Sequence, residues 1–338
     1  MGKGLNTEKS VIIDEPQQKI EIKSMFSQIN SLAGLIVLFI ILSIASPHFL
    51  EIKNLMNIAR QSAINSLVAI GMLMAILTAG IDLSVGSILA LSTVVMGILV
   101  VKLSINPFIG ILVCLLVGSF LGMLNGLMLT KLNLPHPFIS TLGMQNICRG
   151  LALIVTKASP ISGFPPIIQY LGSAFLGPVP VSFILVVIVY LIYNLFLTRT
   201  VTGRHIYAVG GNKEAARLSG INVDKILIIV YTLSGLMAAM GGLVLTGRVN
   251  AAYPLAGLAY ETDAIAAVII GGASFMGGVG TVWGTLIGAM IMAVLRNGLN
   301  LLGVSAEWQT VAIGTVIIGA VYVDVLRRKM QAKSQIAK

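Results

Sequence analysis

Charged residues are scarce in this chain of 338 residues: Asp, Glu, Lys and Arg together make up 10% of it. A globular protein usually draws about 25% of its residues from these four types, because its surface in water must be polar. Here 57% of the residues are hydrophobic and the mean hydropathy is +0.96. The scarcity excludes an ordinary soluble domain and predicts an all-α polytopic membrane protein, since lipid is the solvent in which long apolar runs are stable.

Cysteine and clustered metal ligands are also lacking. The two cysteines, Cys114 and Cys148, fall inside apolar stretches, so we interpret them as small hydrophobic residues. The three histidines are scattered and suggest no metal site or proton relay. The net charge of +10 could indicate nucleic acid, but the basic residues are spread between apolar segments without an aromatic-rich basic face. We therefore expect no metal, no resident cofactor and no nucleic acid.

Ten apolar runs predict about ten transmembrane helices. Most of the runs reach the ~17 to 25 residues that cross a ~30 Å hydrocarbon core, and the first two are short. The polar lead before the first run is too long and too acidic for a signal peptide, which favours an uncleaved first span. The predicted spans are 31–46, 64–80, 84–101, 107–130, 138–156, 180–197, 226–246, 263–280, 283–302 and 309–326.

Lys and Arg resist translocation and therefore accumulate on the cytoplasmic side of a membrane protein. With the amino terminus inside, the inner segments carry fifteen basic residues and the outer segments five. This distribution predicts that both termini are cytoplasmic, which an even number of spans allows. The expected layout is a cytoplasmic tail at 1–30, a transmembrane domain at 31–326 with a cytoplasmic loop at 198–225, and a second tail at 327–338.

Glycines at four-residue spacing mark the fourth and ninth spans. Such a face lets helix backbones approach closely in lipid. The two sets lie 162 positions apart, and an odd number of spans per unit would make them part of two inverted five-helix repeats. The alternative is that glycine is simply common in packed membrane helices. The glycines are Gly118, Gly122 and Gly126 in the fourth span, and Gly280, Gly284 and Gly288 in the ninth.

The segment 198–225 is the longest hydrophilic stretch between spans. Residues 214–220 predict a short helix that glycine ends, and Gly210-Gly211-Asn212 predicts a turn before it. This helix would project from the membrane as a docking element, or the segment is a plain connector whose five basic residues fix the topology. The chain has no Gly-x4-Gly-Lys-Ser/Thr string, so any use of ATP must lie on another chain.

A single carboxylate, Asp82, lies between two nearly abutting apolar spans, where a charge is costly unless it meets water or a partner. Gly80 and Gly86 flank it and permit a broken helix, which is tolerated at membrane depth where it lines a cavity. One interpretation makes this segment, with Ser84, a pathway or gate. The other is a tight turn in which Asp82 caps the helix that follows.

A second glycine-interrupted stretch, residues 269–280, lies between the eighth and ninth spans, although the two stretches are not in corresponding spans. Other polar groups within spans could line a path for a hydroxylated solute or could form interhelical hydrogen bonds. For the two arginines we favour structural pairing or snorkelling. These groups are Asn125, Arg149, Arg296, Asn297 and Asn300.

Charged residues are also predicted on the outer side. They could receive a soluble protein partner through complementary charge, or they could simply face water. The basic ones are Lys53, Arg60, Lys157 and Arg248, and the acidic ones are Glu51, Glu261, Asp263 and Glu307.

Several strings together are similar to a known family. The runs LTAGIDLSVGSILAL, YAVGGNKEAARLSGINVDKILIIVY, YETDAIAAVIIGGASFMGGVGTVWGTLIGA and NGLNLLGVS resemble the permease subunit of bacterial ribose-type ABC importers, in order and spacing, over about residues 32–325. The resemblance implies a ten-span inner-membrane subunit that pairs with a second permease chain. It also implies a periplasmic sugar-binding protein outside and an ATP-hydrolysing subunit inside.

In that family pattern, Glu214, Ala215, Ala216 and Gly220 match the cytoplasmic coupling loop, and the run from Gly80 to Gly86 matches a signature segment. The expected function is translocation of a monosaccharide by alternating access. The chain itself would not be an enzyme, since its partner would use ATP and Mg²⁺. The alternative function is a secondary transporter of a small polar solute, coupled to an ion through Asp82.

Overall fold

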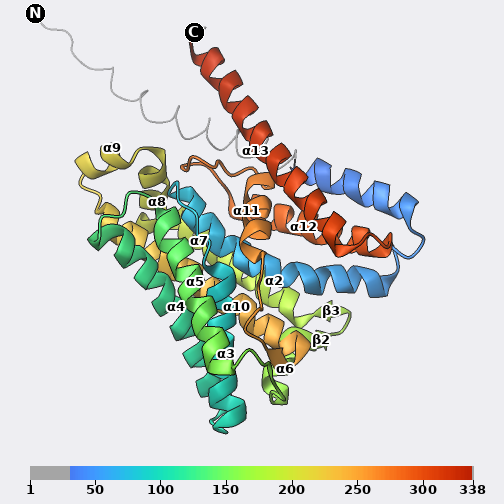
Figure 1. Ribbon diagram of the computed structural model, residues 1–338. Coiled ribbons are helices and arrows are strands. Elements are labelled where there is room, and N and C mark those ends of the chain that lie inside the picture. The colour runs from blue at the N-terminus through green and yellow to red at the C-terminus, as the bar shows by residue number, and fades with distance from the viewer. Residues whose placement is uncertain (1–30, 337–338) are drawn as a thin grey trace, which may run out of the picture.

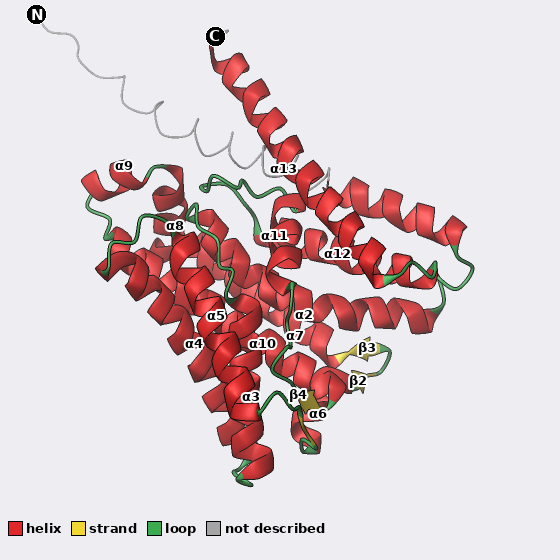
Figure 2. Cartoon of the chain, in the orientation of Figure 1, coloured by secondary structure: helices red, strands yellow, loops and turns green. Residues whose placement is uncertain are grey.

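The computed structural model describes residues 31–336, which form a bundle of helices with very little sheet (Figures 1 and 2). The predicted all-α membrane architecture is confirmed. The tail predicted at 1–30 and residues 337 and 338 lie outside the described residues. The helices are Ser31–Ala45, α2 (Ile52–Leu77), α3 (Val85–Gly97) with the π-helical turn η1 (Ile98–Lys102), α4 (Pro107–Lys131), α5 (Pro137–Thr156), α6 (Pro166–Ser173), α7 (Val181–Arg199), α8 (Val201–Gly211), α9 (Lys213–Leu218), α10 (Val223–Val249), α11 (Tyr260–Ile270), α12 (Val282–Leu301) and α13 (Ala306–Ile336).

Within residues 31–336, four two-residue strands make two antiparallel pairs. One pair joins β1 (Ile161–Ser162) to β4 (Ala251–Ala252), and the other joins β2 (Phe175–Leu176) to β3 (Val179–Pro180). The first pair ties the segment after α5 to the segment after α10. In Figure 1, α9 and the carboxyl end of α13 lie toward one end of the molecule, and the strands lie away from them.

Capping side chains set several helix starts. The Asn106 side chain accepts a hydrogen bond from the backbone N–H of Phe108 at 2.9 Å, and Pro107 occupies the first position of α4. Asn222 accepts from the backbone N–H of Lys225 at 2.9 Å at the start of α10. Both arrangements satisfy N–H groups that the helix itself leaves without partners.

Each of the ten predicted spans overlaps a helix among the described residues. Eight of these helices are long and apolar enough to cross a membrane. The other two, Ser31–Ala45 and α11, are shorter, and α11 has only 11 residues. At 1.5 Å per residue α11 is about 16 Å long, roughly half of a ~30 Å hydrocarbon core.

Two predicted span limits and one predicted turn are wrong. The second span begins at Ile52 rather than at 64, because its first turns are polar and their side chains pair locally, as Arg60 does with Asn57 at 2.6 Å. The eighth span ends at Ile270 rather than at 280, because glycines with positive φ follow it. In the loop at 198–225, Gly210 and Gly211 end helix α8 and only Asn212 lies between helices.

Three helices of the first half of the chain, α2 to α4, correspond to three of the second half, α10 to α12. A shift of about 172 positions carries Ile52 and Leu77, the ends of α2, onto Asp224 and Val249, close to the ends of α10. The contacts follow the same relation: α2 packs on α12 as α4 packs on α10, and α3 packs on α10 as α11 packs on α2. This exchange of partners is the pattern that two inverted repeats produce.

The two glycine sets do not occupy equivalent places in those two halves. A Cβ at Gly118 or Gly122 would run into the backbone of α10, whereas one at Gly284 or Gly288 would run into the backbone of α11 or of Gly271 just after it. Gly280 lies before α12 rather than in it. The 162 positions between the two glycine sets are therefore not the length of the repeat. Both sets nevertheless lie where helix backbones approach closely. Gly126 contacts the backbone of α10 at Ile228 in the same way.

Candidate functional site

The segment between α2 and α3 holds a buried polar network around Asp82. The Asp82 side chain is fully buried, and its carboxylate accepts from the backbone N–H of Ser84 at 3.0 Å and from the Ser84 hydroxyl. Its second oxygen accepts from the Ser234 hydroxyl of α10 at 2.7 Å. The Asn125 side chain of α4 donates to the Ser84 hydroxyl oxygen at 2.8 Å. The network thus fixes the start of α3 against α4 and α10.

This network lies deep inside the bundle. Ser234 is about 17 Å along α10 from its first residue, at 1.5 Å per residue. Ser84 is the N-cap residue of α3, and no side-chain hydrogen bond caps that helix. The contact of Asp82 with the Ser84 N–H therefore closes a tight turn just before α3, as one of the two alternatives expected, but it does not cap the helix. At Gly86 an added Cβ would meet the carbonyl of Gly257, so the start of α3 touches the segment after α10. A pathway role for Gly80, Asp82, Ser84 and Gly86 stays a prediction.

The asparagines of α12 form hydrogen bonds within the bundle. Asn297 and Asn54 of α2 exchange two amide hydrogen bonds, at 2.8 and 3.0 Å. The Asn300 side-chain oxygen accepts from Gln309 of α13 at 2.8 Å. These contacts tie α12 to α2 and to α13. A pathway role for Asn297 and Asn300, as for Asn125, stays a prediction.

The short helix α9 projects from the bundle. Asn212 caps it by accepting from the Ala215 N–H at 2.9 Å, and Gly220, with φ of 82°, ends the turn after it. Ala216 is buried against the bundle, whereas Leu218 is 88% exposed. Glu214 and Arg217 form an exposed ion pair at 3.2 Å. A large apolar side chain is therefore presented among charged ones.

The adjoining helix α8 meets two other segments at close range. A Cβ at Gly210 would overlap the carbonyl of Leu77, the last residue of α2. The same carbonyl accepts from the backbone N–H of Gly278 at 3.0 Å, and the Tyr207 hydroxyl donates to the carbonyl of Gly280 at 2.8 Å. We call this contact of α8, the end of α2 and residues 277–280 the α8 junction. Sequence reasoning missed it, although paired glycines on both sides were the available signal.

The segment 250–259 is held by an arginine from α5. Arg149 donates through Nη1 to the carbonyls of Pro254 at 2.6 Å and Ala256 at 2.8 Å. This fits the structural role favoured for Arg149. The segment touches the start of α3 through Gly257 and leads into α11 at Tyr260.

Asp263 is not on an outer charged rim, as the sequence suggested. It lies in the first turn of α11, is 1% exposed, and pairs with Arg296 of α12 through bonds of 2.8 and 3.0 Å. The pairing role favoured for Arg296 is what the structure shows. The error arose because the predicted span began at 263, whereas α11 carries its charged first turn into the bundle.

The basic residues predicted outside lie on three helix ends. Lys53 and Arg60 are in the first turns of α2 rather than in a loop, and the Arg60 guanidinium stacks on the Phe175 ring at 5.0 Å. Arg248 is in the last turn of α10, near enough to Arg60 for their charges to interact, and Lys157 ends α5. The ends of α2, α5 and α10 thus share one side of the bundle. A docking role for these residues stays a prediction.

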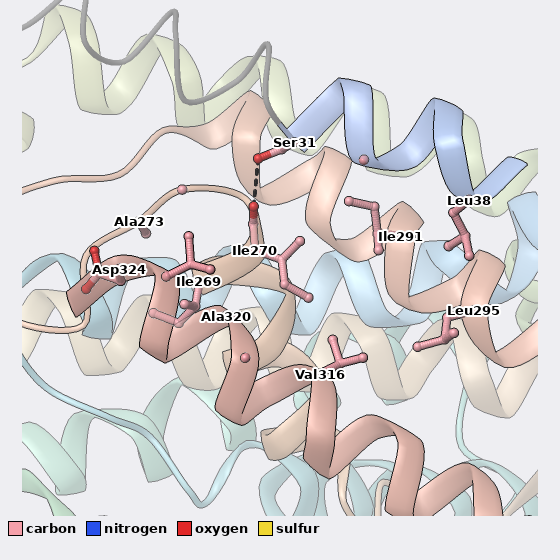
Figure 3. Close-up of a pocket in the computed structure, with 14 residues that line it drawn as sticks. Ser31, Leu38, Ile269, Ile270, Ala273, Ile291, Leu295, Val316, Ala320 and Asp324 are labelled. Carbon is pink, nitrogen blue, oxygen red and sulfur yellow. Dashed lines mark hydrogen bonds between the residues drawn. The ribbon is translucent and has the colours of Figure 1, made fainter. Parts of the chain in front are cut away.

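An apolar pocket of about 480 Å³ lies between the Ser31–Ala45 helix, α12, α13 and the end of α11 (Figure 3). The Ser31 hydroxyl donates to the Ile270 carbonyl at 2.7 Å at its edge, and Asp324 is the one acidic residue among the described residues that line it. Cys114 and Cys148 lie elsewhere, both fully buried as small apolar residues.

Comparison with known proteins adds a family and several relatives. The family described as "Branched-chain amino acid transport system / permease component" matches residues 54–321. The ribose import permease protein of Bacillus subtilis (strain 168) is 43% identical over 318 residues, covering 94% of this chain and 98% of that protein. The D-allose transport system permease protein of Escherichia coli (strain K12) is 42% identical over 297 residues, covering 87% and 90%. No solved structure matches this chain.

Proposed function

The chain belongs to the branched-chain amino acid transport system / permease component family, and we propose that it is the permease subunit of an ATP-binding-cassette importer that carries a monosaccharide, ribose or a related sugar, across the bacterial inner membrane. The similarity to ribose and allose permeases, which runs over nearly the whole chain, carries this proposal. The eight long apolar helices supply the membrane-spanning body.

The helix α9 is the proposed docking point for the ATPase. Leu218 is 88% exposed among the charged residues of α9, and burial of one leucine side chain contributes about 1.5 to 3 kcal/mol. An apolar side chain in this position suits a pocket on a partner protein better than water. Glu214, Ala215, Ala216 and Gly220 build the helix and its stop, and so they position Leu218.

The α8 junction gives the proposed coupling route. Movement of α9 would carry α8, whose Gly210 lies against the end of α2 and against residues 277–280. Those two segments lead directly into the Asp82 segment and into α12. Because the contacts are between backbones, with little side chain to absorb motion, a shift of α8 would be transmitted as a rigid displacement.

Both termini and α9 are proposed to be cytoplasmic, since the predicted inner segments hold most of the basic residues. The opposite side, with Lys53, Arg60, Lys157 and Arg248, would receive a periplasmic sugar-binding protein. A second permease chain, identical or related, would complete the pathway. ATP and Mg²⁺ would be held by the ATPase subunit.

Reconstitution tests the proposal. Vesicles that contain this chain with its ATPase and its sugar-binding protein should take up D-ribose or a related monosaccharide only when ATP is supplied on the cytoplasmic side. Accumulation driven by a proton or sodium gradient in vesicles with this chain alone would instead establish the ion-coupled alternative. The family description makes a branched-chain amino acid the second solute class to assay.

A further inference from the structure

A polar cluster lies on the exposed side of α5, halfway along the helix. Asn146 is exposed, and Gln145 and Arg149 beside it are half-buried. Asn146 is the tenth of the 20 residues of α5, so it sits near the middle of a ~30 Å hydrocarbon core. The only hydrogen bond recorded for its side chain among the described residues runs to Leu142 of its own helix, at 3.0 Å.

The start of α11 completes this cluster. The Gln145 side chain lies 3.5 Å from a carboxylate oxygen of Glu261, and the charges of Glu261 and Arg149 interact. Thr262 follows Glu261 on the exposed side. We call Gln145, Asn146, Arg149 and Glu261 the midspan cluster.

The backbone at this place is shaped to bring the cluster together. Arg149 is fixed by the carbonyls of Pro254 and Ala256. Ala259, which precedes α11, has a φ of 64°, a left-handed conformation that is costly for a residue with a Cβ. The chain thus adopts a strained turn to begin α11 at half depth, which brings Glu261 beside α5.

The midspan cluster would be unfavourable in contact with lipid. Exposed positions of α4 at similar depth are apolar, as at Leu112, Leu116 and Phe120. Polar and charged groups at the centre of a membrane are expensive and usually face water or a partner. Around Asn146 the surface is also open, since a Cβ at Gly143 or Gly150 would touch nothing within 4 Å.

We propose that the midspan cluster lines the translocation pathway and binds a neutral, hydroxyl-rich solute by hydrogen bonds. The charges of Arg149 and Glu261 offset each other, which disfavours an ion. The carboxamides of Gln145 and Asn146 offer both donors and acceptors, as hydroxyl groups require. The inference rests on the proposed function, and it assigns the solute contact to residues other than Asp82.

Labelling of Asn146→Cys tests the water exposure directly. The position is exposed, so the variant should fold, and in membrane vesicles its new thiol should react with a small, charged thiol reagent at least tenfold faster than the thiol of Leu116→Cys. Leu116 is the matched control because it is 58% exposed and is the tenth residue of α4. The unsubstituted chain gives the background from Cys114 and Cys148. Equal, slow labelling of the two variants would overturn the proposal.

Transport by the assembled importer supplies the second measurement. Asn146→Leu should lower ATP-driven D-ribose uptake about tenfold, the effect of roughly one lost hydrogen bond, while Leu116→Ala leaves it unchanged. D-ribose should also protect the thiol of Asn146→Cys from the reagent. Unchanged uptake in Asn146→Leu refutes the solute contact. Absence of monosaccharide uptake by the unsubstituted importer refutes the proposed function instead. In that case the labelling result still decides whether the midspan cluster is exposed to water.

Discussion

Gly278 donates its backbone N–H to the carbonyl of Leu77 at 3.0 Å, joining the segment before α12 to the last residue of α2. Gly210 of α8 lies against the same carbonyl. Three segments far apart in the chain therefore meet at one peptide group. Because α8 carries α9, this peptide group is where the proposed docking helix is mechanically joined to the spans.

Substitution of Gly210 should break that link. In Gly210→Ala the new methyl group would overlap the Leu77 carbonyl, so α8 must move away from α2. We expect sugar uptake to fall at least tenfold while the chain remains in the membrane and its ATPase still binds.

Gly211→Ala is the matched control. A Cβ at Gly211 would touch nothing within 4 Å, so uptake should stay within twofold of the unsubstituted chain. Equal uptake by the two variants would show that the close contact at Gly210 has no part in coupling.

Replacement of Leu218 by Asp should weaken binding of the ATPase subunit. Loss of one buried leucine costs about 1.5 to 3 kcal/mol, which corresponds to roughly a ten- to hundredfold rise in Kd. Binding of the purified ATPase to vesicles containing each variant measures this directly. Leu255→Asp, exposed in the segment after α10, serves as the control and should bind normally. Unaltered affinity in Leu218→Asp would place the docking surface elsewhere.

Much of the fold follows from sequence because each span is a local property. An apolar run such as 107–130 defines α4 almost to the residue, since lipid requires both the apolar surface and the closed backbone hydrogen bonds of a helix. The predicted span limits are wrong where a helix begins with polar or charged residues. The first turns of α2 are polar but helical, and α11 begins with two charged residues, of which the bundle buries Asp263.

The site was harder to predict because it depends on contacts between distant segments. The prediction that Glu214 begins a short helix needs only local signals, such as the Asn212 cap and the stop at Gly220. In contrast, Gln145 next to Glu261 requires knowledge that α11 starts at half depth. That depth is set by the turn at Ala259, and no local sequence pattern predicts the left-handed φ of this residue.

Asp82→Asn should slow transport and leave solute binding by the external protein unchanged. The Asp82 carboxylate accepts three hydrogen bonds, and an amide nitrogen in place of one oxygen would face a donor. The start of α3 would then shift, at a cost of about 1 to 3 kcal/mol. Uptake rates measured beside Asp224→Asn, in the first turn of α10, provide the check. A wild-type rate in Asp82→Asn would leave the tight turn before α3 as the whole role of Asp82.

Close contact of α4 with α10 should make Gly122→Val unstable. A Cβ at Gly122 would overlap the Tyr231 carbonyl, and overpacking of this kind costs about 1 to 3 kcal/mol. Gly314→Ala on α13 meets nothing within 4 Å and should be neutral or slightly stabilising, since alanine favours a helix over glycine by about 1 kcal/mol. Thermal unfolding in detergent compares the two. A lower Tm in Gly314→Ala than in Gly122→Val would contradict the packing argument.

Removing one charge of the ion pair between Asp263 and Arg296 should destabilise the protein more than removing both charges. Arg296→Met leaves the carboxylate of Asp263, 1% exposed, without its cation, and breaking a buried pair costs about 3 to 5 kcal/mol. The double variant Asp263→Asn with Arg296→Met has no uncompensated charge and should recover part of that loss. Tm values of the three proteins in one detergent make the comparison. If the double variant unfolds at a lower temperature than Arg296→Met, the pair contributes through its separate contacts and not through charge compensation.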